Sequence, residues 1–231
     1  MKKIIFIVIT VLIFANAQAQ FEKGSKWVAG SASFSASNNE RNQNPPATDY
    51  KNNRFSIGFR PSLNKFISDK VMNSLFLGYT YSGNKETNSS GYVSKSQGHT
   101  TQFGFGKTFL NPLLGKIYST IATNFFGEYY YSKQENISNN GTNVNTTVSN
   151  NYSANANLGL GLMYRASDRF AITTTLNNFL YARVVSNNQT YNTTGNAETS
   201  NKGFGIDAGL GLAGFNLGNL QFGLMYRLKN K

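Results

Sequence analysis

Apolar residues alternate with small polar residues along most of the chain, which is the period-two pattern of β-strands. The pattern is clearest in residues 152–165, where Tyr, Ala and Leu alternate with Ser, Asn and Gly. It predicts strands in eight regions: 28–36, 55–60, 74–82, 102–109, 117–131, 152–165, 170–180 and 204–228. The alternation is disturbed at Asn177 and Asn178, where we expect a β-bulge.

The connections between these regions alternate in length. The long ones span residues 37–53, 83–98, 132–150 and 186–201, and the short ones span 64–70, 110–116 and 166–169. Transmembrane β-barrels have short inner turns and longer outer loops. We therefore predict an all-β fold, an antiparallel up-and-down barrel of eight strands with four outer loops, whose Asn, Ser, Thr and Gly content predicts mobility. A break at Gly214 to Asn219 is either a bulge or a turn, so a barrel of ten strands is the alternative.

Alternation alone does not say whether the apolar face points outward to lipid or inward to a soluble core. The polar positions are mostly Gly, Ser, Thr and Asn, which suit the narrow interior of an eight-strand barrel. Aromatic residues recur near strand ends, as in the belts at the two lipid interfaces of membrane barrels. The predicted interface aromatics are Trp27, Tyr79, Tyr81, Tyr129, Tyr131, Tyr152, Tyr164 and Tyr226. A soluble exported β-protein remains the alternative.

The first residues have the pattern of a secretion signal. Lys2 and Lys3 precede an apolar run over residues 4–14, and Ala17-Gln18-Ala19 is a small-x-small cleavage site. The apolar run is shorter than the roughly 20 residues that a spanning helix needs. We predict a cleaved signal peptide over residues 1–19, one barrel domain over 20–231 and a location in the outer membrane of a Gram-negative bacterium.

The formal net charge is +12, which could indicate a nucleic-acid partner. The Lys and Arg residues are scattered, however, without a cluster or a helical stripe, so we expect no nucleic acid. Attraction to acidic outer-membrane lipids, including lipopolysaccharide, or to surface glycans fits an exported protein better. We expect a monomer.

Charged residues at polar positions of the strands are predicted to face the barrel interior. These are Arg60, Glu128, Arg165, Asp207 and Arg227. Because an isolated charge in a narrow interior is costly, we predict a network in which the arginines pair with Glu128 and Asp207. The alternative is a gate or permeation path lined by the same charges.

The sequence offers little for catalysis or for metal binding. His99 is the single histidine, there is no cysteine, and no nucleophile motif surrounds His99. Asp and Glu show no calcium-loop spacing. We therefore predict no enzyme activity, no metal and no cofactor.

Three segments resemble a known family. They are Lys26-Trp27-Val28-Ala29-Gly30-Ser31-Ala32-Ser33-Phe34-Ser35, residues 55–62 with 65–69, and the closing residues 222–228. They are similar to small outer-membrane β-barrel proteins common in Bacteroidota, which are related to the OmpA transmembrane domain and OmpX. The resemblance implies this fold and export, and brings no catalytic residue with it.

These observations predict a structural or surface-interaction role. The four polar outer loops would meet an extracellular glycan or protein, and a barrel of eight strands would have no open pore. The alternative is a channel or transporter for a small solute.

Overall fold

The computed structural model describes residues 21–41, 50–88, 91–137, 144–193, 199–210 and 220–229. The predicted signal peptide over residues 1–19 and the break at 214–219 lie outside these ranges. Within the described ranges, no helix has the length and apolar character required to cross a membrane.

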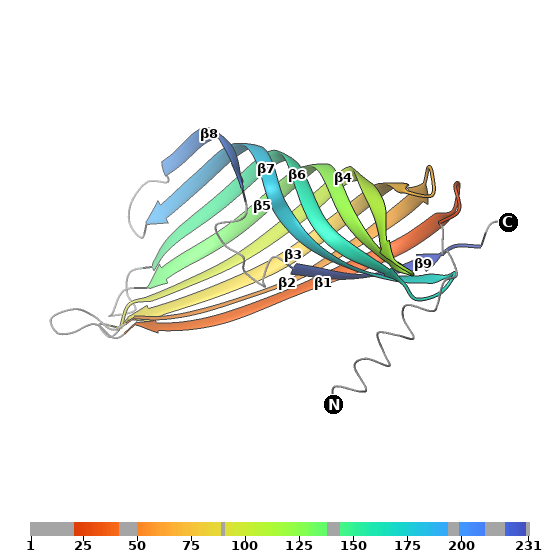
Figure 1. The fold of residues 1–231 in the computed structure, drawn as a ribbon. Coiled ribbons are helices and arrows are strands. Elements are labelled where there is room, and N and C mark those ends of the chain that lie inside the picture. Colours follow the sequence, from red (N-terminus) through yellow and green to blue (C-terminus); the bar gives the residue numbers. More distant parts are fainter. Residues whose placement is uncertain are drawn as a thin grey trace, which may run out of the picture.

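The described residues form one antiparallel sheet of nine strands (Figure 1). The strands are β1 (Lys26–Arg41), β2 (Tyr50–Phe66), β3 (Val71–Asn88), β4 (Val93–Leu114), β5 (Ile117–Ile137), β6 (Val144–Arg165), β7 (Phe170–Thr193), β8 (Thr199–Leu210) and β9 (Leu220–Arg227).

The sheet closes into a ring of eight strands, as the alternation predicted. Strands β1 to β7 pair in chain order, and β9 lies between β7 and β1. Strand β8 pairs with the other part of the same edge of β7, over residues 180–191. The last predicted region is therefore two strands, β8 and β9, which follow one another along β7.

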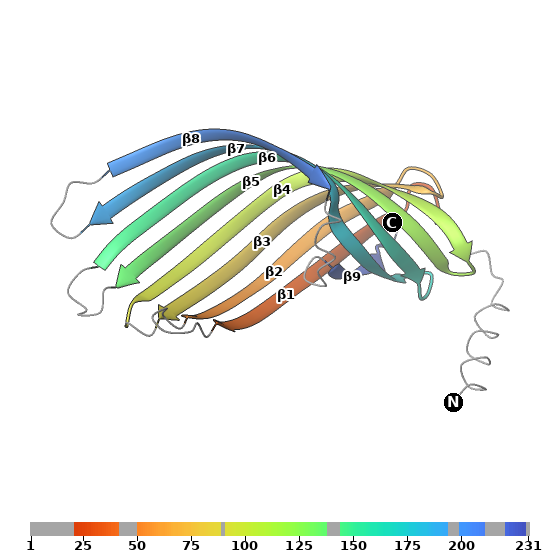
Figure 2. The same ribbon diagram turned by 60° about the vertical axis from the view of Figure 1, so that its left-hand side comes forward.

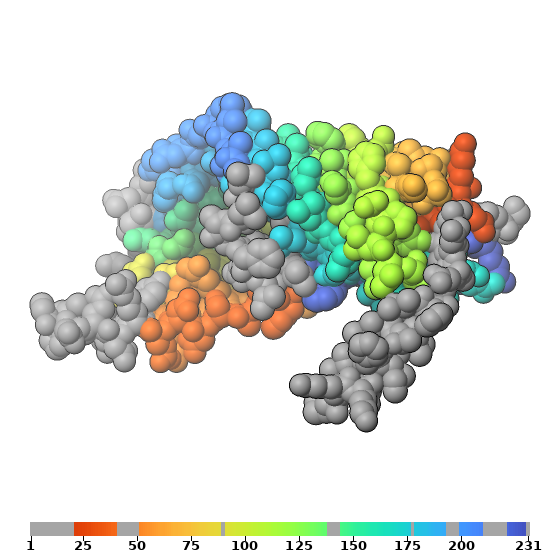
Figure 3. Space-filling view, viewed as in Figure 1, coloured from red at the N-terminus to blue at the C-terminus, as the bar shows by residue number. Residues whose placement is uncertain are grey.

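The short turns between β2 and β3, β4 and β5, and β6 and β7 lie at one end of the barrel, here called the inner end (Figure 2). The space-filling view shows the turns after β2 and β4 close together there, beside the start of β1 (Figure 3). The opposite end, where β3 leads to β4 and β5 to β6, is called the outer end.

The predicted long outer loops are largely paired strand, which corrects the sequence-based expectation. The β3–β4 ladder continues to the pair Thr87 and Val93, and the β5–β6 ladder continues to Ile137 and Val144. A ladder needs only backbone groups, so residues rich in Asn, Ser and Thr can extend it where both faces meet water. Alternation disappears there because most residues on both faces are polar.

The apolar side chains point outward, which rules out the soluble alternative for this fold. Phe34 and Phe204 are each 72% exposed, and Ile206 is 75% exposed. The same face carries further exposed residues: Phe55, Ile57, Phe59, Leu63, Leu75, Leu77, Phe103, Phe105, Phe109, Ile121, Phe125, Leu162, Ile172, Leu180, Phe222 and Leu224. An apolar band of this size around a closed barrel fits contact with lipid.

The bulge predicted near Asn177 is present in β7. Asn178 has a positive φ of 59°, and the pairing of β6 with β7 shifts between Leu158 and Leu160. The Asn157 amide donates a hydrogen bond to Asn178 Oδ1 at 2.7 Å. Outward parity is the same on both sides of the bulge, because Leu176 and Leu180 both pair with outward-facing leucines of β6.

Candidate functional site

The inner end of the barrel interior is filled by an apolar core. Phe21 stacks on Phe66 with a centroid distance of 4.4 Å, and the Trp27 ring packs edge-on to Phe21 at 5.6 Å. The buried members of this inner core are Phe21, Trp27, Phe66, Met72, Leu110, Tyr118, Met163, Ala171 and Met225. Because Phe21 enters this core, the segment before β1 takes part in closing the inner end.

Trp27 is not a lipid-interface residue, contrary to the sequence-based prediction. It is 1% exposed, and its Nε1 donates a hydrogen bond to Ser25 Oγ at 3.1 Å. The reason is strand parity: Val28 and Phe34 face outward, so an odd-numbered residue of β1 faces the interior.

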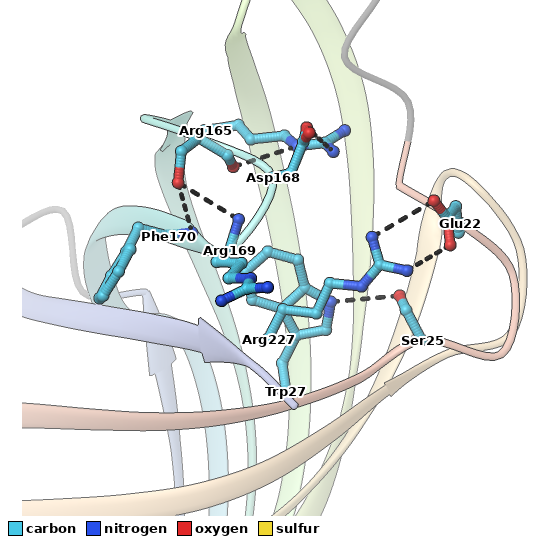
Figure 4. A network of polar contacts seen from close by, with 9 residues as sticks. Glu22, Ser25, Trp27, Arg165, Asp168, Arg169, Phe170 and Arg227 are labelled. Carbon is cyan, nitrogen blue, oxygen red and sulfur yellow. Dashed lines mark hydrogen bonds and ion pairs between the residues drawn. The ribbon is translucent and has the colours of Figure 1, made fainter. Parts of the chain in front are cut away.

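Two arginines hold the inner rim together, each with its own carboxylate (Figure 4). Arg227 forms an ion pair with Glu22, whose pKa is held below its usual range by the hydrogen bond and charge of Arg227. Arg165 is buried, pairs with Asp168 at 2.9 Å, and lies 5.2 Å from the centre of the Phe21 ring. These contacts attach the segment before β1 and the β6–β7 turn to the inner core.

The middle of the interior holds Arg60. Its guanidinium lies 3.4 Å from the centre of the Phe76 ring, a cation–π contact with a buried aromatic side chain. A cavity of about 130 Å³ surrounds this contact, and its walls include Ser62, Ser74 and Asn124.

Toward the outer end lies a polar region, here called the outer chamber, formed by Gln102, Glu128, Asn151, Arg183 and Asp207. Gln102 donates a hydrogen bond to Glu128 at 2.7 Å, and Arg183 pairs with Asp207 at 3.4 Å. Glu128 and Arg183 line both of two cavities of about 280 and 330 Å³. Arg183 Nε and Asn151 Oδ1 are buried without a hydrogen-bond partner in the described residues.

The predicted charge network is not formed as one unit. Arg60, Arg165 and Arg227 lie in the interior or at its inner rim, yet none pairs with Glu128 or Asp207 in the described residues. The arginine that pairs with Asp207 is Arg183, which the sequence analysis missed. Alternation beyond the bulge could have found it, since Ala182 and Val184 face outward and Arg183 therefore faces inward.

The remaining predicted interface aromatics all lie on the outward face: Tyr79, Tyr81, Tyr129, Tyr131, Tyr152, Tyr164 and Tyr226. Tyr129 and Tyr152 are direct neighbours across β5 and β6, with a centroid distance of 5.0 Å. Tyr226 packs against Phe170 near the inner end, at 5.1 Å. That they lie at the lipid interfaces stays a prediction.

His99 lies on the same outward face. Its Nδ1 is 2.7 Å from the Tyr79 hydroxyl, and the rings of Tyr81 and Tyr131 flank it on the neighbouring strands. The surroundings of His99 are therefore aromatic, unlike those of a catalytic base, which needs a nucleophile and an orienting carboxylate. Across the described ranges, no three His, Cys, Asp or Glu side chains gather as metal ligands would.

The closed ring, the outward apolar band and the polar interior define a transmembrane β-barrel of the outer-membrane type. No family model and no curated protein matches the chain.

Solved structures with a similar arrangement include three outer-membrane proteins. The translocator domain of autotransporter NalP from Neisseria meningitidis is 11% identical, with 98% of this chain and 97% of that chain covered and a TM-score of 0.43. A major outer membrane protein from Thermus thermophilus is 8% identical, with 88% and 99% covered and a TM-score of 0.42. The ferric yersiniabactin uptake receptor FyuA from Yersinia pestis is 12% identical, with a TM-score of 0.41. That match covers 80% of this chain and 31% of the receptor.

Proposed function

We propose that this protein resides in the outer membrane of a Gram-negative bacterium as a monomeric surface-interaction protein without an open pore. The observation that carries the proposal is the continuation of paired strands past the apolar band. About 9–11 residues of a strand suffice to cross a bilayer, whereas β4 and β6 have 22 residues each and β7 has 24.

The surplus length lies at the outer end. Beyond the outward-facing Tyr81 and Tyr131, most side chains on both faces are polar or charged, and the apolar exceptions on the outward face are Val93, Ile137, Val144 and Val148. The outer extension is defined here as residues 82–88, 93–98, 132–137 and 144–149. On its inward face, Glu86 accepts hydrogen bonds from Asn52 and Asn84, both at 3.0 Å. Paired strands with polar, water-exposed side chains offer an ordered surface, which supports contact with a glycan or a protein.

Two strand edges favour a protein partner. Among the described residues, the polar outer parts of two strands pair on one side alone: residues 199–203 of β8 pair with β7, and residues 37–41 of β1 pair with β2. An edge with free backbone donors and acceptors can take up an extended segment of another chain by strand addition.

The orientation can be tested with single cysteines, because the chain has none of its own. We expect Thr199→Cys, at the exposed start of β8, to react with a membrane-impermeant maleimide on intact cells. Asp69→Cys, in the turn between β2 and β3, should react only after lysis. The reverse labelling pattern would contradict the proposed orientation.

A small-solute channel is the second candidate, and the polar outer chamber favours it, because Arg183 Nε has no hydrogen-bond partner in the part of the chain that the structure describes. The inner core argues against it, since nine buried side chains among the described residues fill the inner end. We expect purified protein in planar bilayers to give no stable conductance. Reproducible single-channel steps from heat-modifiable, folded protein would overturn the proposal and support the channel.

A further inference from the structure

Two lysines face each other on the outside of the outer extension. Lys85 of β3 and Lys95 of β4 are direct register partners, and both are exposed. They share the outward parity of Tyr81 and His99. Like charges directly opposite one another destabilise a sheet, unless an anion lies between them. The sequence therefore tolerates a repulsive pair at this position.

A third lysine adds to this charge. Lys133 of β5 is a neighbour of Gln97 in the register and pairs with Glu135 at 2.8 Å. The hydrogen bond and charge of Lys133 lower the pKa of Glu135, and Lys95 adds a smaller lowering. Glu135 is the register partner of Lys95 on β5, but the ion pair that it forms is with Lys133. No carboxylate in the described residues forms a salt bridge with Lys85 or Lys95.

An aromatic shelf lies directly below these lysines, toward the apolar band. The His99 ring is 5.2 Å from Tyr81 and 6.1 Å from Tyr131, and Phe55 packs on Tyr81 at 5.6 Å. Below the shelf, Leu77 and Phe103 are exposed apolar side chains. From the outer end toward the apolar band, the outward face therefore carries cations first, then aromatic rings and then hydrocarbon side chains. Lys85 is four residues beyond Tyr81, which is about 13 Å along a strand. Because the strand is tilted and the lysine side chain is flexible, its ammonium group can lie closer to the apolar band, at the depth of the lipid headgroups.

The opposite end of the barrel provides a comparison. Lys26 and Lys65 are also exposed register partners on the outward face, but the next outward pair is Val28 and Leu63. On β9, Tyr226 pairs with Val28, so the inner pair has the same charge beside one tyrosine, without the histidine and the two tyrosines that flank that histidine at the outer end.

We infer that the outward face of β3, β4 and β5 at the outer end binds the phosphate groups of a phosphorylated glycolipid of the outer leaflet. Lys85 and Lys95 hold a phosphate between them, Lys133 contributes from the side, and the aromatic shelf packs against the glycolipid's sugar and upper acyl region. This site rests on the orientation in the proposed function, and it gives the protein a specific lipid partner.

The test uses the purified full-length barrel in detergent, titrated with bisphosphorylated lipid A, with the same lipid after phosphate removal, or with phosphatidylglycerol. Native mass spectrometry counts the bound lipids. Because each lysine near an anionic surface adds to the attraction, we expect K85Q/K95Q to weaken lipid A binding by about tenfold or more. The matched control K26Q/K65Q should bind as the unaltered protein does, and K85R/K95R should retain binding.

Heat-modifiable gel migration of every variant shows that the barrel is folded. Equal binding by K85Q/K95Q and the unaltered protein would overturn the site, and so would equal losses in the two glutamine variants. Comparable binding of phosphatidylglycerol or of dephosphorylated lipid A would overturn the ligand class. These outcomes are independent of the conductance and labelling experiments, so a failure here is distinguishable from a failure of the proposed function.

Discussion

Replacing Trp27 by Ala should lower the free energy of unfolding by about 3–5 kcal/mol, the usual cost of removing a large buried aromatic side chain. Trp27 is 1% exposed and packs against Phe21, which itself stacks on Phe66. Removing the indole leaves a cavity in the inner core and deprives Ser25 Oγ of its donor. Reversible urea unfolding in detergent micelles, followed by intrinsic fluorescence of tyrosines or by far-UV circular dichroism, measures the change.

The matched control is Phe34→Ala, because Phe34 is an aromatic residue of the same strand that faces outward and is 72% exposed. It contacts only lipid or detergent on its outer side, so its truncation should cost clearly less than that of Trp27. If W27A and F34A unfold at the same denaturant concentration, the inner core does not stabilise the barrel as the packing implies. Ser25→Ala separates the hydrogen bond from the packing, with an expected cost of about 1 kcal/mol.

The wall of the barrel was predictable because lipid on one side and a crowded interior on the other impose alternation. Where that contrast ends, the signal ends too. The sequence of residues 83–98 is mostly polar and predicts a loop, although the backbone of residues 83–87 and 93–98 continues the β3–β4 ladder. The turn at 166–169 was predicted correctly because it interrupts alternation on both sides.

The interior was harder to predict than the wall. Parity alone places Arg60 and Glu128 inside, but the partner of each charge depends on the register between strands and on the bulge at Asn178. Register is set by backbone pairing over the whole strand, and composition does not reveal it. For Trp27, by contrast, the sequence did contain the answer. Its parity relative to the outward-facing Val28 places it in the interior, but the prediction followed the general preference of tryptophan for lipid interfaces instead.

Gly104 and Gly127 should respond in opposite ways to the same added methyl group. They lie on adjacent strands, where Gly104 pairs with Phe126 and Gly127 pairs with Phe103. A Cβ at Gly104 would overlap the Phe125 carbonyl oxygen and the Phe126 Cβ, with Phe126 Cα 2.8 Å away. A Cβ at Gly127 would meet nothing within 4 Å.

Because the obstacle at Gly104 includes backbone, the neighbouring strand must shift before an alanine can fit. We expect Gly104→Ala to lower the free energy of unfolding by about 1–3 kcal/mol, as overpacking does, and to reduce the folded fraction in heat-modifiability gels. Gly127→Ala points into open space on the outward face and should stay within about 0.5 kcal/mol of the unaltered protein. A G104A barrel as stable as G127A would mean that β4 and β5 are not as closely apposed as their register requires, which would also remove the basis for the narrow interior.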